Sequence, residues 1–550
     1  MTNQRYHHRR TEFRYQTWCR SRSIFDLTVS LIILHPAKDL AKWQRTGPAS
    51  TRARALVISP TPLGELNSKE ATIADLDSKY IPPPVGTLPP DFYHGYSTAA
   101  FQCEGGWDAD GKGPSVWDDL GHNPRPAPYD MRNGELGDDA MNSYYQYKED
   151  IALLKSYGSN AYRFSISWPR VIPLGGRDDP INEKGLQFYS DLVDECLANG
   201  ITPFPTLYHW DLPLPLEQRY EGWSNTAEII PDFVRFADVM FAKLGDRVKF
   251  WLTINEPWNV VNLNGHLKPT FKPERDTFLV GHNLLLAHAH TVDLYRKKYQ
   301  PTQHGKISIV NVKPIDDTPE VKELQKKRLD FAFHWFSDPL YFGTYPPSML
   351  ATVPQEQLPE FTPEDVKLLK GSCDFFALNS YSSMYVTGKE CDNPAGGNVD
   401  TSMFDKEGKP VGDIRGCFSW LWNAPWGFRK LLRHVHERYT GPTGHAIYIT
   451  ENGFPTDGEH HRRFPDLLHD TERQNFFDAY LHELSEAVEK DGINIRGYMA
   501  WSLLNTMEWY CGYGPRLGVT HVDRENGFKR YPKDCTKVVK AWMESAIRKG

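Results

Sequence analysis

Eight short apolar runs recur between residues 91 and 501, and longer segments with helical spacing of apolar positions separate them. The runs are continuously apolar rather than alternating, which is typical of strands buried on both faces. We expect strands at Tyr93–Thr98, Ala161–Ile166, Thr202–Tyr208, Lys249–Ile254, Lys306–Val312, Asp374–Asn379, Ala446–Thr450 and Ile495–Trp501. The main helical candidates between them are Asp150–Ser156, Lys184–Ala198, Ala227–Leu244, Leu279–Tyr299, Gly427–Tyr439 and Asp470–Asp491. Eight strands alternating with helices predict an α/β protein with a (β/α)8 TIM barrel and long βα loops.

The first part of the chain does not share this pattern. Residues 1–60 contain eleven Lys and Arg but only three acidic residues, and a Pro-rich stretch, Ile81–Pro90, follows. The apolar stretch Ile24–Leu34 is shorter than the roughly 20 residues that a membrane span needs, and no clean signal peptide is recognisable. We therefore predict a basic, poorly ordered extension over residues 1–87 and the barrel domain over residues 88–550.

Composition and charge limit which binding partners and which cellular compartment we expect for the protein. The net charge of −7 argues against nucleic acid as a partner, and nothing indicates a membrane partner. Eight scattered cysteines without a CxxC pair, and no Asn-x-Ser/Thr sequon, favour a reducing compartment. We expect a cytoplasmic protein; an Arg-rich start leaves mitochondrial targeting as the alternative. The two histidines of His288-Ala-His290 would point to different faces of a helix, and neither a Gly-rich phosphate loop nor a zinc spacing appears, so we expect no metal and no cofactor.

Two glutamates stand at the ends of predicted strands. Glu256 closes Leu252-Thr-Ile-Asn-Glu256-Pro, and Glu451 closes Tyr448-Ile-Thr-Glu451-Asn-Gly. A barrel brings strand ends that are distant in sequence to one mouth. A retaining glycosidase needs two carboxyl groups about 5–5.5 Å apart, one to protonate the leaving oxygen and one to attack the sugar carbon. The pair therefore predicts a glycosidase site.

Other polar and aromatic residues lie in or just after further predicted strands of the barrel. Such a mixture suits a sugar, because hydroxyl groups need paired donors and acceptors while the C–H face of the ring stacks on indole. Any one of these residues alone is more simply a core residue, but together with Glu256 and Glu451 they gather at seven strand ends, which favours a binding site. The candidates are Gln102, Arg163, His209, Asn255, Tyr381, Trp501, Glu508 and Trp509.

From about Leu88 to its end the chain resembles family 1 glycoside hydrolases, and most of all the intracellular fungal β-glucosidases. The motifs that carry the resemblance include Gly95-Tyr-Ser-Thr-Ala-Ala-Phe-Gln-Cys-Glu-Gly105, Tyr162-Arg-Phe-Ser-Ile-Ser-Trp168, Thr206-Leu-Tyr-His-Trp-Asp211, Asn255-Glu-Pro, Thr450-Glu-Asn-Gly and Gly497-Tyr-Met-Ala-Trp-Ser502. The resemblance implies Glu256 as acid/base and Glu451 as nucleophile. It further implies Gln102, His209, Asn255, Glu508 and Trp509 as ligands of the sugar hydroxyls, and Trp501 as the stacking floor. Arg163 and Tyr381 would contact the nucleophile.

The chain also departs from the family pattern. Asn505-Thr-Met-Glu-Trp509 stands where Asp-Asn-Phe-Glu-Trp is usual, so the shell around Glu508 is altered. The expected substrate is a small β-glucoside or disaccharide. A β-galactosidase or β-fucosidase of the same family, and a barrel that only binds glycans, are the alternatives. A 6-phospho-β-glycosidase is disfavoured because Glu508 would repel a phosphate. The oligomeric state is left open.

Overall fold

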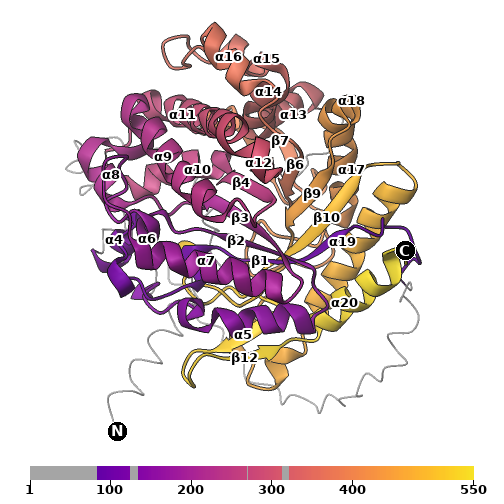
Figure 1. The fold of residues 1–550 in the computed structure, drawn as a ribbon. Helices are drawn as coiled ribbons and strands as arrows, with labels where there is room; N and C mark the ends of the chain where they lie inside the picture. The colour runs from indigo at the N-terminus through magenta and orange to yellow at the C-terminus, as the bar shows by residue number, and fades with distance from the viewer. Residues whose placement is uncertain (1–82, 124–133, 269, 313–320, 550) are drawn as a thin grey trace, which may run out of the picture.

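The protein is a closed barrel of eight parallel strands surrounded by helices (Figure 1). This computed structural model describes residues 83–123, 134–268, 270–312 and 321–549. The barrel strands are β1 (Tyr93–Ser97), β2 (Ala161–Ser165), β3 (Thr202–Tyr208), β4 (Phe250–Asn255), β5 (Lys306–Val312), β6 (Phe376–Asn379), β9 (Ile447–Glu451) and β10 (Ile495–Trp501). Sequential strands pair in parallel, and β1 closes the barrel against β10. The predicted barrel is confirmed, and each strand boundary lies within two residues of its prediction.

The interior of the barrel is filled by apolar side chains. They form a cluster separate from the main core, as expected for residues that face inward from successive strands. Phe204 and Phe250 stack within it with ring centroids 4.4 Å apart, and Tyr93 packs edge-on against both rings. Val310, Ala377 and Met499 complete the layer from other strands. This packed layer supports the polar side chains at the carboxyl ends of the strands.

The predicted helices surround the barrel. They are α5 (Ser143–Ser156), α7 (Glu183–Ala198), α9 (Thr226–Leu244), α11 (Pro273–Leu294), α17 (Pro425–Val435) and α19 (Thr471–Glu489). Helix α5 begins seven residues before its prediction. The guanidinium of Arg170 lies 4.1 Å from the ring centroid of Tyr144, so a tertiary contact stabilises a first turn that local pattern does not mark. Helices α11 and α17 each continue into a π-helical turn, Tyr295–Tyr299 and His436–Thr440.

Several elements were not predicted. Two antiparallel hairpins lie in the loops after β6 and β10: β7 (Tyr385–Glu390) with β8 (Val399–Ser402), and β11 (Thr520–Asp523) with β12 (Lys529–Pro532). Their strands are short and largely polar, so they lack the apolar runs on which the prediction relied. Helix α10 (Pro257–Leu267) directly follows the first glutamate, and α20 (Cys535–Ala546) is near the end of the chain.

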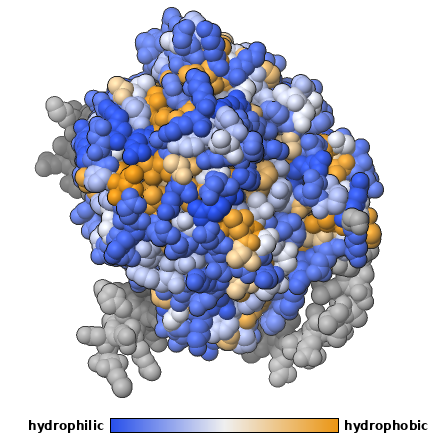
Figure 2. Space-filling model, in the orientation of Figure 1, coloured by the Kyte–Doolittle hydropathy of each residue, from blue (hydrophilic) through white to orange (hydrophobic). Residues whose placement is uncertain are grey.

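The chain enters the barrel along its C-terminal helix. Gly86 and Leu88 donate backbone hydrogen bonds to Ser545 and Ala546 of α20, and the Leu88 side chain is fully buried. The predicted extension lies almost wholly outside the described residues, in residues 1–82. Over the described residues, no helix is long and apolar enough to cross a bilayer. The face in Figure 2 is mostly hydrophilic with small separate apolar patches.

Removing residues 1–82 should leave the melting temperature unchanged, whereas Leu88→Ala should lower it by several degrees. The physical reason is that truncating a buried leucine costs about 2–5 kcal/mol. Thermal unfolding of the two variants beside the full chain, followed by circular dichroism, makes the comparison. A deletion that destabilises as much as Leu88→Ala would show that the extension packs on the barrel.

Candidate active site

The two glutamates lie at the carboxyl ends of β4 and β9, and both are buried. The other predicted site residues lie in, end or follow strands of the same barrel, and Asn255 is the last residue of β4. Gln102 lies in α3 (Ala100–Cys103) after β1, and His209 directly follows β3. Arg163 lies in β2, Tyr381 follows β6 and Trp501 ends β10, with Glu508 and Trp509 beyond it. The closed sheet therefore brings all the predicted residues to one mouth.

The carboxylate of Glu451 is held by a cation and a phenol. Arg163 Nη1 donates to Glu451 Oε1, and the Tyr381 hydroxyl donates to Oε2 at 2.5 Å. The guanidinium is fully buried, and it also donates to Asn255 Oδ1 at 2.7 Å and Thr206 Oγ1 at 3.1 Å. Burial and the Glu451 carboxylate raise the pKa of Tyr381 well above its usual value, so the phenol stays a donor. Each oxygen of the Glu451 carboxyl group therefore accepts a hydrogen bond from a different strand end.

The carboxyl group of Glu256 has a different environment. Two amides donate to it: Asn379 Nδ2 to Oε1 at 2.7 Å, and Asn259 Nδ2 to Oε2 at 2.5 Å. Burial, followed by repulsion from Glu451, raises the pKa of Glu256 to about 8. Glu256 is therefore mostly protonated at neutral pH, because its pKa lies above 7.

The two glutamates are connected through two amide side chains. Asn255 Oδ1 accepts from Arg163, which binds Glu451, and also from Asn379 Nδ2 at 3.2 Å, which binds Glu256. The amide of Asn379 is oriented in turn by Thr450, whose hydroxyl donates to Asn379 Oδ1 at 2.7 Å. A displacement of either carboxyl group therefore affects the hydrogen bonds of the other.

The residues predicted to bind a sugar form a second group beside the glutamates. Gln102 Nε2 donates to Glu508 Oε2 at 3.2 Å, and burial together with Glu451 raises the pKa of Glu508 to about 8. The His209 ring lies nearly parallel to those of Trp501 and Trp509, with centroids 5.8 and 6.0 Å away. Burial, and then Arg163, lower the pKa of His209 well below its usual value. The ring is therefore neutral, with one donor and one acceptor nitrogen.

Two buried atoms of this second group have no hydrogen-bond partner among the described residues: Gln102 Oε1 and His209 Nδ1. The opposite sides of both groups are occupied, since Gln102 Nε2 donates to Met507 O at 2.8 Å and His209 Nε2 lies 3.1 Å from Asn255 Nδ2. Leaving a buried polar atom unpaired costs about 1–3 kcal/mol. A ligand with hydroxyl groups would satisfy both atoms.

The loop that carries Glu508 is anchored although its sequence departs from the family pattern. Lys533 Nζ, fully buried, donates to Asn505 Oδ1 at 2.9 Å and to Gly518 O at 2.7 Å. The backbone of Met507 donates to Gln102 O at 3.2 Å, and the Met507 side chain is buried. The altered shell thus still brings Glu508 against Gln102.

Sequence reasoning missed several contributors. Asn259 was assigned no role, although it lies one helical turn after Glu256, a spacing that could have pointed to it. Asn379 was recognised only as a strand end, and Thr206 and Thr450 only as parts of motifs. Trp210 was noted beside His209 without a function; its indole N–H donates to Asn255 O at 2.9 Å. Apart from Asn259, each acts through a contact with a residue of another strand, which local sequence does not reveal.

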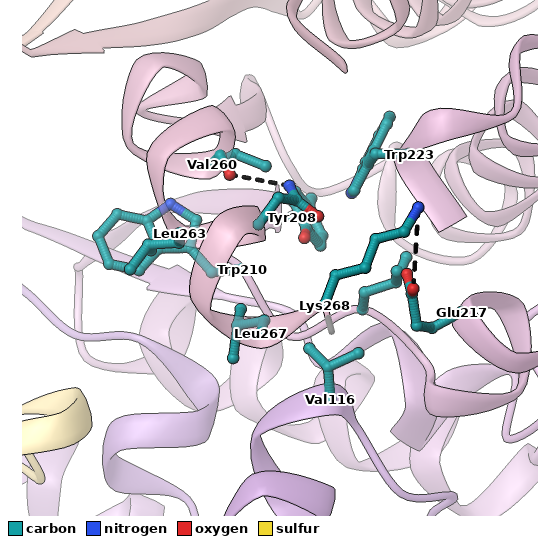
Figure 3. A pocket seen from close by; sticks show the side chains of 11 residues that line it. Val116, Tyr208, Trp210, Glu217, Trp223, Val260, Leu263, Leu267 and Lys268 are labelled. Atoms are coloured by element: carbon teal, nitrogen blue, oxygen red, sulfur yellow. Dashed lines mark hydrogen bonds and ion pairs between the residues drawn. The ribbon is translucent and has the colours of Figure 1, made fainter. Parts of the chain in front are cut away.

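A hollow beside α10 has a lining that includes neither Glu256 nor Glu451 (Figure 3). Most of its lining is apolar or aromatic, including Tyr208, Trp223 and Leu263. Its charged members, Lys268 and Glu217, pair at 3.9 Å, and Lys268 Nζ also donates to Glu221 O at 2.9 Å. The hollow therefore offers no unpaired acid or base. In the described part of the chain, no group of three His, Cys, Asp or Glu side chains could hold a metal ion.

Comparison with known proteins places this site in a family. The family model described as "Glycosyl hydrolase family 1" matches residues 85–548. "Beta-glucosidase 1B" of Phanerodontia chrysosporium is 43% identical over 483 residues, which cover 84% of this chain and 87% of that relative.

A crystal structure of a GH1 β-glucosidase from the fungus Humicola insolens, in complex with glucose, is also similar. It has a TM-score of 0.79 and 43% identity, and the match covers 84% of this chain and 99% of that chain. The β-glucosidase 2 of Trichoderma reesei, in complex with Tris, gives a TM-score of 0.80 and 41% identity over 84% of this chain and 100% of that chain. The chain belongs to glycosyl hydrolase family 1.

Proposed function

We propose that this protein is a retaining β-glucosidase that removes terminal, non-reducing β-D-glucosyl residues from small glucosides or disaccharides. The observation that carries the proposal is the asymmetry of the two buried carboxyl groups. Glu451 is bound by Arg163 and Tyr381, whereas the pKa of Glu256 is raised to about 8. One group is therefore suited to attack and the other to deliver a proton. The β-glucosidase names of the similar proteins support the same substrate class.

In the first half-reaction the Glu451 carboxylate attacks the anomeric carbon and forms an α-glucosyl ester. The bond between this carbon and the glycosidic oxygen breaks, and Glu256 transfers its proton to the departing oxygen. Arg163 and Tyr381 orient the attacking carboxylate. The aglycone leaves as a neutral alcohol or phenol.

In the second half-reaction water hydrolyses the ester. Ester formation removes the negative charge of Glu451, and with it the repulsion that raises the pKa of Glu256. Glu256 is then ionised, accepts a proton from the water as it attacks, and returns to its acid form. Glu451 leaves as a carboxylate. Two inversions at one carbon give a glucose with the original β configuration.

We propose that the second group of residues binds the glucosyl ring. Gln102 Oε1 and His209 Nδ1, both buried and unpaired, would bond to hydroxyl groups. Glu508, whose pKa is about 8, can both donate and accept. Trp501 would stack on the C–H face of the ring, and Trp509 and Asn255 would bind further hydroxyls.

Two further points belong to this proposal. Both carboxyl groups have the partners that catalysis needs, which speaks against a barrel that only binds glycans.

We also propose a compartment that keeps thiols reduced, such as the cytoplasm. Five cysteines of the described residues, Cys103, Cys196, Cys373, Cys391 and Cys535, are free thiols.

The Glu451→Gln variant should lower the pKa of Glu256, because a neighbouring negative charge is removed. The pKa should stay above that of an exposed glutamate, since burial is the larger cause. In the wild type, kcat/KM should fall as the pH rises through about 8, where Glu256 loses its proton. Carbon-13 NMR titration of labelled glutamate gives the pKa directly, and Glu256→Gln identifies its resonance. An unchanged pKa in Glu451→Gln would show that the two carboxyl groups are not coupled.

Azide should give opposite anomers of glucosyl azide with the Glu451→Ala and Glu256→Ala variants. In Glu451→Ala, azide can enter the space of the lost carboxylate and should yield the α-glucosyl azide. In Glu256→Ala, a dinitrophenyl glucoside needs little protonation and should still form the ester with Glu451, which azide then opens to the β-glucosyl azide. Proton NMR of the products distinguishes the anomers. The reverse assignment would exchange the roles of the two glutamates, and failure of both rescues would refute the mechanism.

A further inference from the structure

Both oxygens of the Glu256 carboxyl group accept a hydrogen bond from an amide nitrogen. Asn379, at the end of β6, binds Oε1, and Asn259 in α10 binds Oε2 at 2.5 Å. Asn259 is buried, with 8% of its surface exposed, so water does not compete freely for this contact. An amide NH2 group donates and cannot accept, whichever oxygen it meets. The contact therefore stabilises the carboxylate form of Glu256.

The position of Asn259 is fixed by the packing of α10. Glu256 precedes the helix in the left-handed region, with φ of 46°, and Asn259 follows within the first turn. Val260, Leu263 and Leu267 line the hollow on one side of the helix, which fixes its rotation about its axis (Figure 3). Trp258 Nε1 also donates to Ala395 O at 2.7 Å. The Asn259 amide is thus held against Glu256 by the fold as well as by its own bond.

The other groups that face Glu256 come from three strands. Glu451 on β9 repels its charge, while Arg163 on β2 attracts it. The Tyr381 phenol, after β6, stays neutral because its pKa is raised. Asn379 donates to the opposite oxygen. Of these groups, Arg163 and Tyr381 also bind Glu451, and Asn379 also binds Asn255. Within the described residues, the one side-chain hydrogen bond of Asn259 is the bond to Glu256, so a change there can act on the acid alone.

We propose that Asn259 is a positioning residue that favours the carboxylate of Glu256 and thereby biases the enzyme toward glucosides whose leaving group needs little protonation, such as phenols. This inference rests on the proposed function and deepens it. Stabilising the carboxylate raises the fraction of Glu256 that is ionised, which is the form that activates water. It lowers, near pH 8, the fraction that is protonated, which is the form that donates a proton to the leaving oxygen. Alkyl glucosides and disaccharides, which leave as poor alkoxides without a proton, depend more strongly on that donation.

The test replaces Asn259 by leucine, which has a similar size and no donor. The pH at which kcat/KM falls on the alkaline side (the alkaline limb) should rise by about one unit, because the carboxylate loses a charge-assisted hydrogen bond. At pH 8–9 the ratio of kcat/KM for phenyl glucoside to that for 4-nitrophenyl glucoside should rise several-fold. Asn262→Leu is the matched control, since Asn262 lies on the same helix and donates to Trp258 O instead. It should leave both readouts unchanged.

A second variant keeps the test valid if Asn259→Leu does not fold. Asn259→Asp keeps the shape of the side chain, removes the donor and adds a negative charge, so its alkaline limb should also lie above that of the wild type. If the limb stays in place in both variants, whether or not kcat falls, the inference is wrong. A limb that moves equally in Asn262→Leu would overturn it as well, because the shift would then reflect general loosening of α10.

A titration separates this inference from the proposed function. Carbon-13 NMR of Glu256 in wild type and Asn259→Leu needs no turnover, and the pKa should be higher in the variant. If the wild type fails to hydrolyse aryl β-glucosides, the proposed function is wrong, yet a raised pKa in the variant would still support the Asn259 contact. If the wild type is active and the pKa is equal in both proteins, only this inference fails.

Discussion

The structure of the barrel mouth depends on one buried ion pair, that between Arg163 and Glu451. A guanidinium without solvent contact is costly unless its donors are satisfied. Arg163 meets this requirement by bonding to side chains on three other strands: Thr206 on β3, Asn255 on β4 and Glu451 on β9. The need to satisfy one charge therefore fixes the strand ends relative to one another. Breaking such a buried pair from one side costs about 3–5 kcal/mol, so the same contact supports both the fold and the chemistry.

That pair also determines the protonation of the site. With Arg163 and Glu451 neutralising each other, the pocket contains two more carboxyl groups, and neither has a cation of its own in the described structure. Burial and the Glu451 charge raise the pKa values of Glu256 and Glu508 to about 8. Glu256 and Glu508 are therefore mostly protonated near neutral pH, beside the carboxyl group of Glu451 that Arg163 and Tyr381 bind. The proposed mechanism uses this asymmetry, because ester formation on Glu451 removes the repulsion and releases Glu256 to act as a base.

Sequence alone predicted the parts of the fold that have a strong local pattern. The eight barrel strands are buried on both faces, so their apolar runs are unmistakable, and Thr202–Tyr208 and Ile495–Trp501 match the structure residue for residue. The β7–β8 and β11–β12 hairpins were missed because polar strands in long loops carry no such run. Likewise, motifs located Glu256 and Glu451, but the bond from Asn259 depends on the entry angle of α10. Residues Val260, Leu263 and Leu267 of α10 line the same hollow as Trp210, just after β3, and this tertiary arrangement is not encoded by a local pattern. The extension predicted for residues 1–87 lies mostly outside the described residues and stays a prediction.

The central claim is that a glucosyl residue is carried on Glu451 between two inversions. The most direct test is the anomeric configuration of glucose at the moment of its release. Proton NMR of a reaction with an aryl β-glucoside, recorded faster than mutarotation, resolves the anomeric protons. The account predicts that β-glucose appears first and that α-glucose accumulates only later as the sugar mutarotates. Initial release of α-glucose would mean a single inversion, and it would contradict the assignment of Glu451 as nucleophile.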